Sequence, residues 1–282
     1  MGRPNPGRLV PRTGRSGSRH QPCRAECELP LQRPESPRDP RLAGRLDPDH
    51  RPGNRPRHES AQKLWLQSGT ATIYAHRFDA PNDEFTGIIG GNEPNVPETW
   101  RFSIKVAQAW EQAVEEAVTP ATRKVILRSA MVMSPDPGGI FDVLLGLVRK
   151  GLGGRAGNGR QFVSWIHQVD FINAIHWLIE HDEISGAINL SAPNPLPNDA
   201  FMREIRKASG TRIGLPATRW MLEIGAIFLK TEIELILKSR RVVPGRLLEA
   251  GFRFKYPEWP AAVADLCLGH KLMQSEKGST TL

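Results

Sequence analysis

Apolar positions follow two different periods along the chain from residue 61 onward. Short apolar runs predict strands, and apolar positions three or four residues apart predict helices between them. The predicted strands are 64–74, 125–132, 162–166 and 187–190, and the predicted helices are 99–117, 140–149, one beginning at 170 and one over 198–209. Strands that alternate with helices indicate a parallel sheet covered on both faces. The pattern therefore predicts an α/β, Rossmann-like fold.

Three of these helices have distinct sequence features. The 99–117 segment carries apolar side chains at helical spacing, namely Phe102, Val106, Ala109, Trp110, Ala113 and Ala117. Asp170 and Asn198 stand where an N-cap residue belongs, before the apolar face of a helix. Gly210 is expected to close the last helix. We take the glycine-rich residues 153–159 as turn geometry, because they follow a helix and precede a strand, the wrong order for a phosphate cradle.

The segment after residue 214 has a different, more helical pattern. Amphipathic helices are predicted over 218–238, followed by a turn of helix over 244–250 that Gly251 ends and a strand over 252–254. We therefore expect an incomplete Rossmann-like domain over 61–214. A small α-rich C-terminal domain over 215–268 and a polar tail over 269–282 would follow it.

Residues 1–60 have a composition unlike the rest of the chain. They hold 13 Arg, 11 Pro, seven acidic residues, no Lys and no aromatic residue. Too few apolar side chains are present to offset the entropy of ordering the chain, so we expect this tract to be disordered. Three interpretations stay open. The tract is a frame-shifted or remodelled N-terminus, a native disordered tail, or an Arg-rich arm that binds a polyanion.

Charge and cysteine content narrow the remaining possibilities. The tract contributes +6 of the net charge of +8, so the basic pI describes the tract, and nucleic acid is not the expected partner of the globular part. No apolar stretch reaches the roughly 18 residues of a membrane span. Three cysteines, two of them Cys23 and Cys27, make neither a disulfide framework nor a zinc site. We expect a cytoplasmic protein without a metal, and the oligomeric state is left open.

Several segments in a fixed order resemble one family. They are Leu66–Tyr74, Trp110-Glu111, Arg128–Val132, Gly151–Gly154, Gly157–Gln161, Ser164–Asp170, Asn189–Pro193, Val243-Pro244 and Ala250–Pro257. Over about 205 residues the chain is similar to the atypical extended short-chain dehydrogenase/reductases known as epimerase-family proteins, which carry a C-terminal domain of unknown function. The resemblance implies a NAD(P)-dependent epimerase or oxidoreductase that acts on a small molecule, a sugar nucleotide being one candidate.

The resemblance also implies where catalysis would occur. In this superfamily a Ser or Thr at the end of a central strand binds the reacting oxygen, and a Tyr with a Lys four residues later acts as acid or base. Gly69 matches the Ser position here, so its neighbours Ser68 and Thr70 become the candidates, although they share the opposite face of the strand. Tyr74 is the candidate acid or base, and Phe78 stands where the Lys would be.

Cofactor and substrate contacts follow from the same resemblance. The backbone near Val132 would contact the nicotinamide end of NADP, and Arg128 would face the cleft or lie at the sheet edge. Trp165 and His167 would shape the substrate pocket, unless they serve packing and helix capping. The family's glycine-rich phosphate turn has no counterpart in the sequence. Activity is therefore expected to be impaired, and a non-catalytic binding protein is the alternative.

Overall fold

A three-stranded parallel sheet lies at the centre of the fold, in a computed structural model that describes residues 63–94, 96–216 and 238–279. Its strands, in the order β1-β2-β6, are β1 (Lys63–Thr70), β2 (Thr122–Ser129) and β6 (Gly186–Leu190). β2 is central, and its apolar residues Val125, Ile126 and Leu127 are all buried. A short 3-10 helix, η2 (Ala71–Ile73), follows β1 directly. The predicted α/β class is confirmed.

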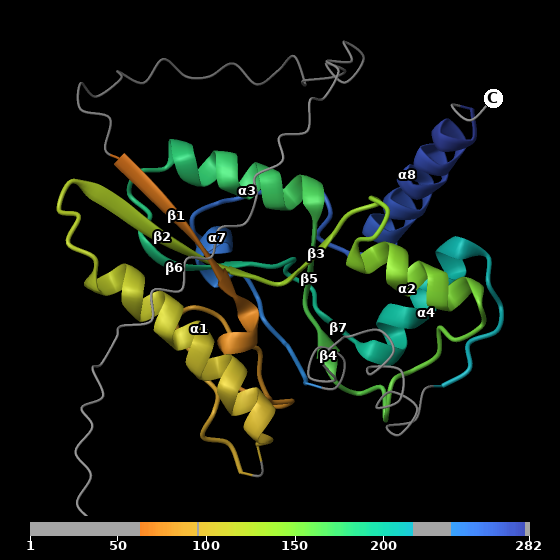
Figure 1. The fold of residues 1–282 in the computed structure, drawn as a ribbon, viewed down its shortest axis with the longest axis horizontal. Coiled ribbons are helices and arrows are strands. Elements are labelled where there is room, and N and C mark those ends of the chain that lie inside the picture. The colour runs from red at the N-terminus through yellow and green to blue at the C-terminus, as the bar shows by residue number, and fades with distance from the viewer. Residues whose placement is uncertain (1–62, 95, 217–237, 280–282) are drawn as a thin grey trace, which may run out of the picture. The chain divides into compact units, whose positions relative to one another are not determined.

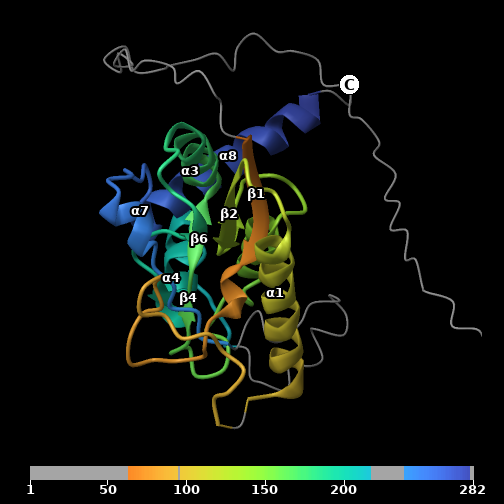
Figure 2. The same cartoon turned by 90° about the vertical axis from the view of Figure 1, so that its left-hand side faces the viewer.

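Helices cover both faces of this sheet. α1 (Glu98–Glu116) lies on one face and α3 (Gln168–Glu180) on the other (Figures 1 and 2). Ala174 and Leu178 of α3 pack in one cluster with Val125 and Ile188 of the sheet. The right-handed crossovers of parallel strands place the connecting helices in this way.

The helix predicted over 99–117 is confirmed, but its apolar stripe points away from the sheet. Ile104, Ala107 and Val114 are the buried residues of α1. Phe102 is 69% exposed and Trp110 is 51% exposed. α1 is therefore apolar on two sides, and the more regular stripe is the one that faces solvent.

A second layer of helices packs beside short strand pairs (Figure 1). The pairs are β3 (Met131–Met133) with β5 (Trp165–His167), which are parallel, and β4 (Phe162–Val163) with β7 (Leu196–Pro197), which are antiparallel. The helices are α2 (Ile140–Arg149), α4 (Asn198–Ser209) and α8 (Trp259–Ser279), and the five-residue α7 (Gly245–Glu249) contacts β6. Stacked rings of Phe201 and Trp259, 4.2 Å apart, lie in their shared core.

Both predicted N-caps are wrong, for one physical reason. α3 begins at Gln168 and is capped by His167, while the Asp170 carboxylate accepts the backbone N–H groups of Lys255 and Tyr256. α4 begins after Pro197, and the Asn198 side chain accepts the N–H of Ala156 instead. In each case the side chain that the local pattern predicted as a helix cap instead accepts a hydrogen bond from a loop that is distant in the sequence. Gly210, at φ 74°, closes α4 as predicted.

The C-terminal predictions have mixed outcomes. α7 matches the expected turn of helix, but the strand predicted over 252–254 is wrong, because these residues pair with no strand. Phe252 and Phe254 meet edge to face at 4.8 Å and pack beside the sheet. α8 continues to Ser279, through most of the predicted tail. The helices predicted over 218–238 fall, apart from Lys238, outside the described residues, as do residues 1–60.

Candidate functional site

Three residues meet in one row at the carboxyl end of the sheet. Gly69 of β1 is in register with Arg128 of β2, which is in register with Asn189 of β6. Residues in register across a sheet project to the same face, and this is the face that α1 covers. A Cβ at Gly69 would come within 3.1 Å of the Ile126 side chain and 3.2 Å of the Leu127 carbonyl oxygen. The absence of a side chain at Gly69 therefore avoids a close contact with β2 at this end of the row.

The Tyr74 hydroxyl joins the other two members of this row. It donates to Asn189 Oδ1 at 3.0 Å and accepts from Arg128 Nη1 at 2.8 Å. The same guanidinium donates from Nε and Nη2 to both carboxylate oxygens of Glu111 on α1, at 2.8 and 2.7 Å. We name Tyr74, Glu111, Arg128 and Asn189 the tyrosine network. Bidentate pairing fixes the guanidinium plane and therefore the position of the phenol.

Burial sets the protonation states of this network. Tyr74 is 2% exposed, and burial raises its pKa above the usual value, although the Arg128 cation opposes the shift. Burial alone would lower the pKa of Arg128, but the Glu111 carboxylate and the Tyr74 hydroxyl outweigh it and raise the pKa. At neutral pH the network therefore contains a neutral phenol and a charged guanidinium. Such a phenol positions its neighbours and does not release its proton readily.

A carboxylate from the loop after β1 binds the backbone at Asn189, the last residue of the row. Glu84 accepts the backbone N–H of Asn189 at 2.7 Å and that of Arg246, the second residue of α7, at 3.2 Å. Burial raises the pKa of Glu84, and the two N–H donors oppose that shift. Glu84 thus ties the loop, β6 and α7 together.

The predicted catalytic hydroxyls lie on the other side of β1. Side chains alternate between the two faces of a strand, so Ser68 and Thr70 lie on the same face of β1 as Leu64 and Leu66. These two leucines pack with the cluster beneath α3. The Thr70 hydroxyl is occupied as the N-cap of η2, because it accepts the N–H of Thr72 at 3.2 Å. The sheet therefore separates Ser68 and Thr70 from the Tyr74 hydroxyl, and the three predicted residues do not form one cluster.

Trp165 and His167 lie in the interior. Trp165 is fully buried against Trp259, with ring centroids 4.8 Å apart. His167 is 1% exposed, and its Nδ1 accepts the N–H of Val169 while Nε2 lies 3.2 Å from Asp265 Oδ2. Its ring packs 4.1 Å from that of Tyr256. Both side chains therefore act here through packing and capping, and a direct substrate contact stays a prediction.

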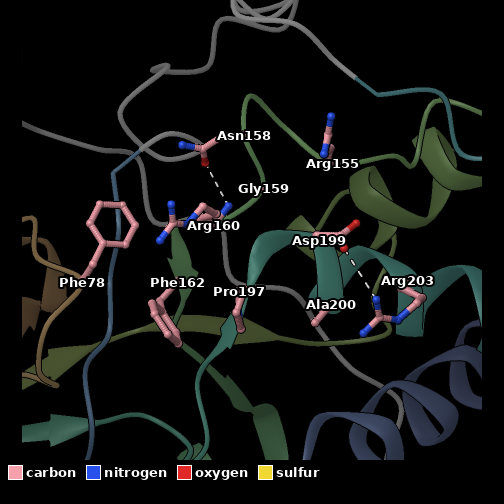
Figure 3. A pocket seen from close by; sticks show the side chains of 10 residues that line it. All are labelled: Phe78, Arg155, Asn158, Gly159, Arg160, Phe162, Pro197, Asp199, Ala200 and Arg203. Carbon is pink, nitrogen blue, oxygen red and sulfur yellow. Dashed lines mark hydrogen bonds and ion pairs between the residues drawn. The ribbon is translucent and has the colours of Figure 1, made fainter.

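A basic cleft of about 440 Å³ opens between the loop after β1, strand β4 and the start of α4. Arg155, Arg160 and Arg203 line it, with Asp199 as the opposing charge (Figure 3). Asp199 lies 3.5 Å from Arg203, whereas neither Arg155 nor Arg160 has an acidic partner in the described part of the chain. The ring of Phe162 forms part of the wall, and the Arg241 guanidinium lies 4.6 Å from its centroid.

Sequence reasoning missed this cleft. The sequence predicted a turn over residues 153–159, and the positive φ angles of Gly157 and Gly159 are those of turn residues. The arginines that flank this turn, with no nearby acidic residue in sequence, were the available signal. Their convergence with Arg203 depends on the β4–β7 pairing, which joins residues more than 30 positions apart. Local pattern cannot show such a pairing.

Binding of a dinucleotide would place a specific demand on the described residues. A pyrophosphate needs free backbone N–H groups at a glycine-rich turn between a strand and a helix. The nearest such turn, residues 137–139, leads into α2, but the N–H of Gly138 donates to Asp142 Oδ2 and that of Gly139 to the Asp136 carbonyl oxygen. The Asp142 carboxylate would also repel a phosphate. This turn therefore does not fit the pyrophosphate part of a nicotinamide cofactor.

The described residues also bear on membrane spanning and metal binding. None of their helices has the length and apolar character required to cross a membrane. No group of three or more His, Cys, Asp or Glu side chains among them could hold a metal ion. Cys267, in α8, is buried as a free thiol.

Comparison with known proteins gives the relatives of this chain. Residues 217–266 match the family described as "Domain of unknown function (DUF1731)". The human epimerase family protein SDR39U1 is 30% identical over 204 residues, which are 72% of this chain and 65% of that protein. Epimerase family protein ML0860 of Mycobacterium leprae is 32% identical over 200 residues, 70% of this chain and 60% of that protein.

A solved structure shows the same arrangement. The crystal structure of human SDR39U1 (isoform 2) with NADPH is similar with a TM-score of 0.63 at 27% identity, over 74% of this chain and 67% of that one. A nucleoside-diphosphate sugar epimerase of Corynebacterium glutamicum, at 22% identity and a TM-score of 0.53, shares the fold.

The fold and the site together define the class of protein. A parallel β1-β2-β6 sheet between helices, with polar side chains at its carboxyl end, is a Rossmann-like arrangement. Within that class, the chain is similar to the epimerase-family proteins among the atypical extended short-chain dehydrogenase/reductases, and its residues 217–266 match the domain of unknown function. The chain spans less than two thirds of the length of the human and mycobacterial relatives.

Proposed function

We propose that this chain is a NAD(P)-dependent epimerase- or oxidoreductase-type protein that retains the substrate side of its site and is impaired in cofactor binding. The observation that carries the proposal is the tyrosine network at the carboxyl end of a parallel sheet, the edge where α/β folds bind their ligands. A relative whose structure contains NADPH supports a nicotinamide cofactor for the family. The choice of NADP over NAD, like contacts with Val132 and Arg128, belongs to this proposal.

The chemistry of the described residues supports the proposed impairment. The glycine turn at residues 137–139 offers no free amide cradle for a pyrophosphate, because the N–H groups of Gly138 and Gly139 are already hydrogen-bonded. Tyr74 is hydrogen-bonded on both sides, so it is better suited to positioning than to proton transfer. We assign no reaction step to the cofactor. Roles of Ser68, Thr70 and Tyr74 in turnover would need them to rearrange from the positions found here.

The substrate side is the basic cleft. Arg155, Arg160 and Arg203 against Asp199 give the cleft a charge of +2, which favours a small anionic molecule. A phosphorylated compound such as a sugar nucleotide is one candidate, because guanidinium groups bind phosphate in bidentate fashion. The domain division, with a C-terminal unit over 215–268, is part of the same proposal.

Two titrations of the purified full chain test this function. Titration with NADPH, followed by its fluorescence, is expected to show no saturation below about 1 mM, because the diphosphate finds no amide cradle. Tight NADPH binding would overturn the impairment. Titration with UDP-glucose, followed by calorimetry, is expected to show binding that weakens at least tenfold when Arg155→Glu and Arg160→Glu are combined.

The matched control is Arg253→Glu, which reverses an exposed arginine outside the cleft. It makes the same change in charge per site and is expected to leave binding within twofold. An equal loss in both variants would show general charge attraction in place of a site. No binding of UDP-glucose or of inorganic pyrophosphate by the unmodified chain would overturn the substrate assignment.

A further inference from the structure

A segment of the C-terminal part of the chain runs across the carboxyl end of the sheet and leads into α7. We name residues 238–244 the belt, which is drawn in blue in Figure 1. Its hydrogen bonds reach the segment after β1, the loop that follows it, and β4. The contacts are Lys238 Nζ with the Thr72 carbonyl oxygen at 2.7 Å, the Arg240 N–H with the Phe162 carbonyl oxygen at 2.8 Å, the Asn82 N–H with the Arg241 carbonyl oxygen at 2.7 Å and the Val243 N–H with the Asn82 carbonyl oxygen at 3.0 Å.

The centre of the belt packs beside Tyr74. Val242 is fully buried, and it belongs to the same apolar cluster as the Tyr74 ring. The Ser164 hydroxyl holds Val242 in this place, because it accepts the N–H of Val242 at 2.8 Å and donates to the Arg240 carbonyl oxygen at 2.6 Å. Ser164 is itself only 1% exposed. The position of the belt beside the phenol therefore depends on one buried hydroxyl group.

The next residue of the belt determines how the Asn189 amide is oriented. The Val243 carbonyl oxygen accepts from Asn189 Nδ2 at 3.0 Å. A carbonyl oxygen has no proton to donate, so the NH2 group of Asn189 must face it and the amide oxygen must face Tyr74. Arg128, which also contacts the phenol, has donors only. The hydroxyl proton of Tyr74 therefore points to Asn189 Oδ1, 3.0 Å away.

We infer that the belt sets the direction of the Tyr74 hydroxyl proton, because the Val243 carbonyl oxygen orients the Asn189 amide and the amide oxygen accepts that proton. Asn189 is then a positioning residue that acts on a ligand only through the phenol. While the belt is in place, Tyr74 has no proton to offer to a ligand. The inference rests on the proposed function, in which the tyrosine network belongs to the site, and it gives the impaired proton transfer a cause. It also assigns a role to residues within the segment that matches the domain of unknown function.

Titration of Tyr74 in the full chain tests this inference. Tyr256→Phe makes Tyr74 the sole tyrosine, and absorbance at 295 nm then gives its phenolate fraction. Ser164→Ala releases the belt, so the Asn189 amide is free to turn its NH2 group toward the phenol oxygen. A donor at this oxygen favours the phenolate, whose fraction at pH 11 is expected to rise about threefold. In an Asn189→Ala background no amide can turn, and Ser164→Ala is expected to raise the fraction by less than about 1.5-fold.

Asn198→Ala in the same Tyr256→Phe chain is the matched control. It also removes a buried hydrogen bond, in which Asn198 Oδ1 accepts the N–H of Ala156 at 2.8 Å, but it does so at the start of α4. The phenolate fraction is expected to stay within about 1.3-fold of its starting value. Circular dichroism at pH 11 verifies that each variant is folded. An equal rise in Ser164→Ala and Asn198→Ala, or an equal effect of Ser164→Ala in both backgrounds, would overturn the inference.

Asn189→Asp tests the same connection from its other end, at pH 7. The carboxylate cannot donate to the Val243 carbonyl oxygen, so hydrogen exchange of the Val242 and Val243 N–H groups is expected to accelerate about tenfold. Unchanged exchange would show that the belt is held without Asn189, against the inference. Both measurements use the chain without cofactor or substrate. A failed titration with NADPH or UDP-glucose therefore counts against the proposed function alone.

Discussion

The Arg128 guanidinium and the Tyr74 hydroxyl lie 2.8 Å apart, although 54 residues separate them in the sequence. The contact joins β2 to the segment just after β1 on the face beneath α1. Because Nε and Nη2 of Arg128 donate to Glu111, the position of the Tyr74 phenol depends on the Arg128–Glu111 ion pair. The effect of this contact on the stability of the protein and its effect on the titration of Tyr74 can be measured separately.

The Arg128–Glu111 pair should contribute strongly to stability. Each side chain is only 12% exposed, so removal of one partner leaves a poorly solvated charge. Arg128→Met is expected to lower the free energy of unfolding by about 3 kcal/mol, measured by urea denaturation. The double variant with Glu111→Leu should recover much of that loss, since no lone charge remains. A loss below about 1 kcal/mol in Arg128→Met would mean that water reaches Glu111.

Tyrosine ionisation should occur well above its usual range in the native protein. The chain has two tyrosines, Tyr74 and Tyr256, and burial raises the pKa of both, that of Tyr256 to about 12 with help from its hydrogen bond to Asp265. Absorbance at 295 nm is therefore expected to show no tyrosine titrating near pH 10 until urea unfolds the chain. Tyr256→Phe leaves Tyr74 as the sole signal.

The sign of the linked stability effect follows directly. A raised pKa means that the folded state holds the phenolic proton more tightly than the unfolded state. This contribution to stability is complete below about pH 10 and is lost as the pH rises through the folded pKa. Tyr74→Phe should flatten the alkaline loss of stability. A native titration of Tyr74 near pH 10 would contradict the buried position of its hydroxyl.

The sequence alone was sufficient for the fold class and for most element boundaries. α2 was predicted at its observed bounds. The buried part of β2 was predicted as well, because three consecutive apolar residues are typical of a buried strand. The side of α1 that packs was not found. The apolar residues at the most regular spacing in that helix include the exposed Phe102 and Trp110, and period alone does not say which apolar side meets the sheet.

The candidate site was less predictable than the fold. Tyr74, Arg128 and Asn189 each lie in segments that resemble the family, but their meeting depends on strand register across β1, β2 and β6. Asp170 shows the same limit, because its carboxylate serves a loop 85 residues away. A polar group of this kind accepts a hydrogen bond from whichever N–H the tertiary structure brings near. The local sequence pattern does not identify that partner.

Two glycines in comparable helices should respond oppositely to alanine. Gly146 lies inside α2 with open space where a Cβ would be, so Gly146→Ala is expected to stabilise the protein by about 0.8 kcal/mol. Gly210 also has open space, but its φ is 74°, so Gly210→Ala is expected to cost about 1 kcal/mol. Thermal unfolding of the two variants measures both values. Equal shifts of the same sign would rule out backbone conformation as the cause.

His167 should make the protein less stable in mild acid. Burial lowers its pKa, while Asp265 opposes the shift, so the folded state holds the ring neutral where the unfolded chain takes up a proton. The contribution to stability is therefore present above about pH 6.5 and is lost as the pH falls toward the folded pKa. Urea denaturation at pH 7.5, 6.5 and 5.5 measures the slope.

His167→Asn is the informative variant for this slope. Asn keeps an acceptor for the Val169 N–H and remains a good N-cap for α3, but it does not titrate. Its stability should change less between pH 7.5 and 5.5 than that of the unmodified protein. Burial also lowers the pKa of His76, yet His76 is present in both proteins, so its effect cancels in the difference. Parallel pH curves would show that folding leaves the pKa of His167 unchanged, because the Asp265 carboxylate then balances its burial.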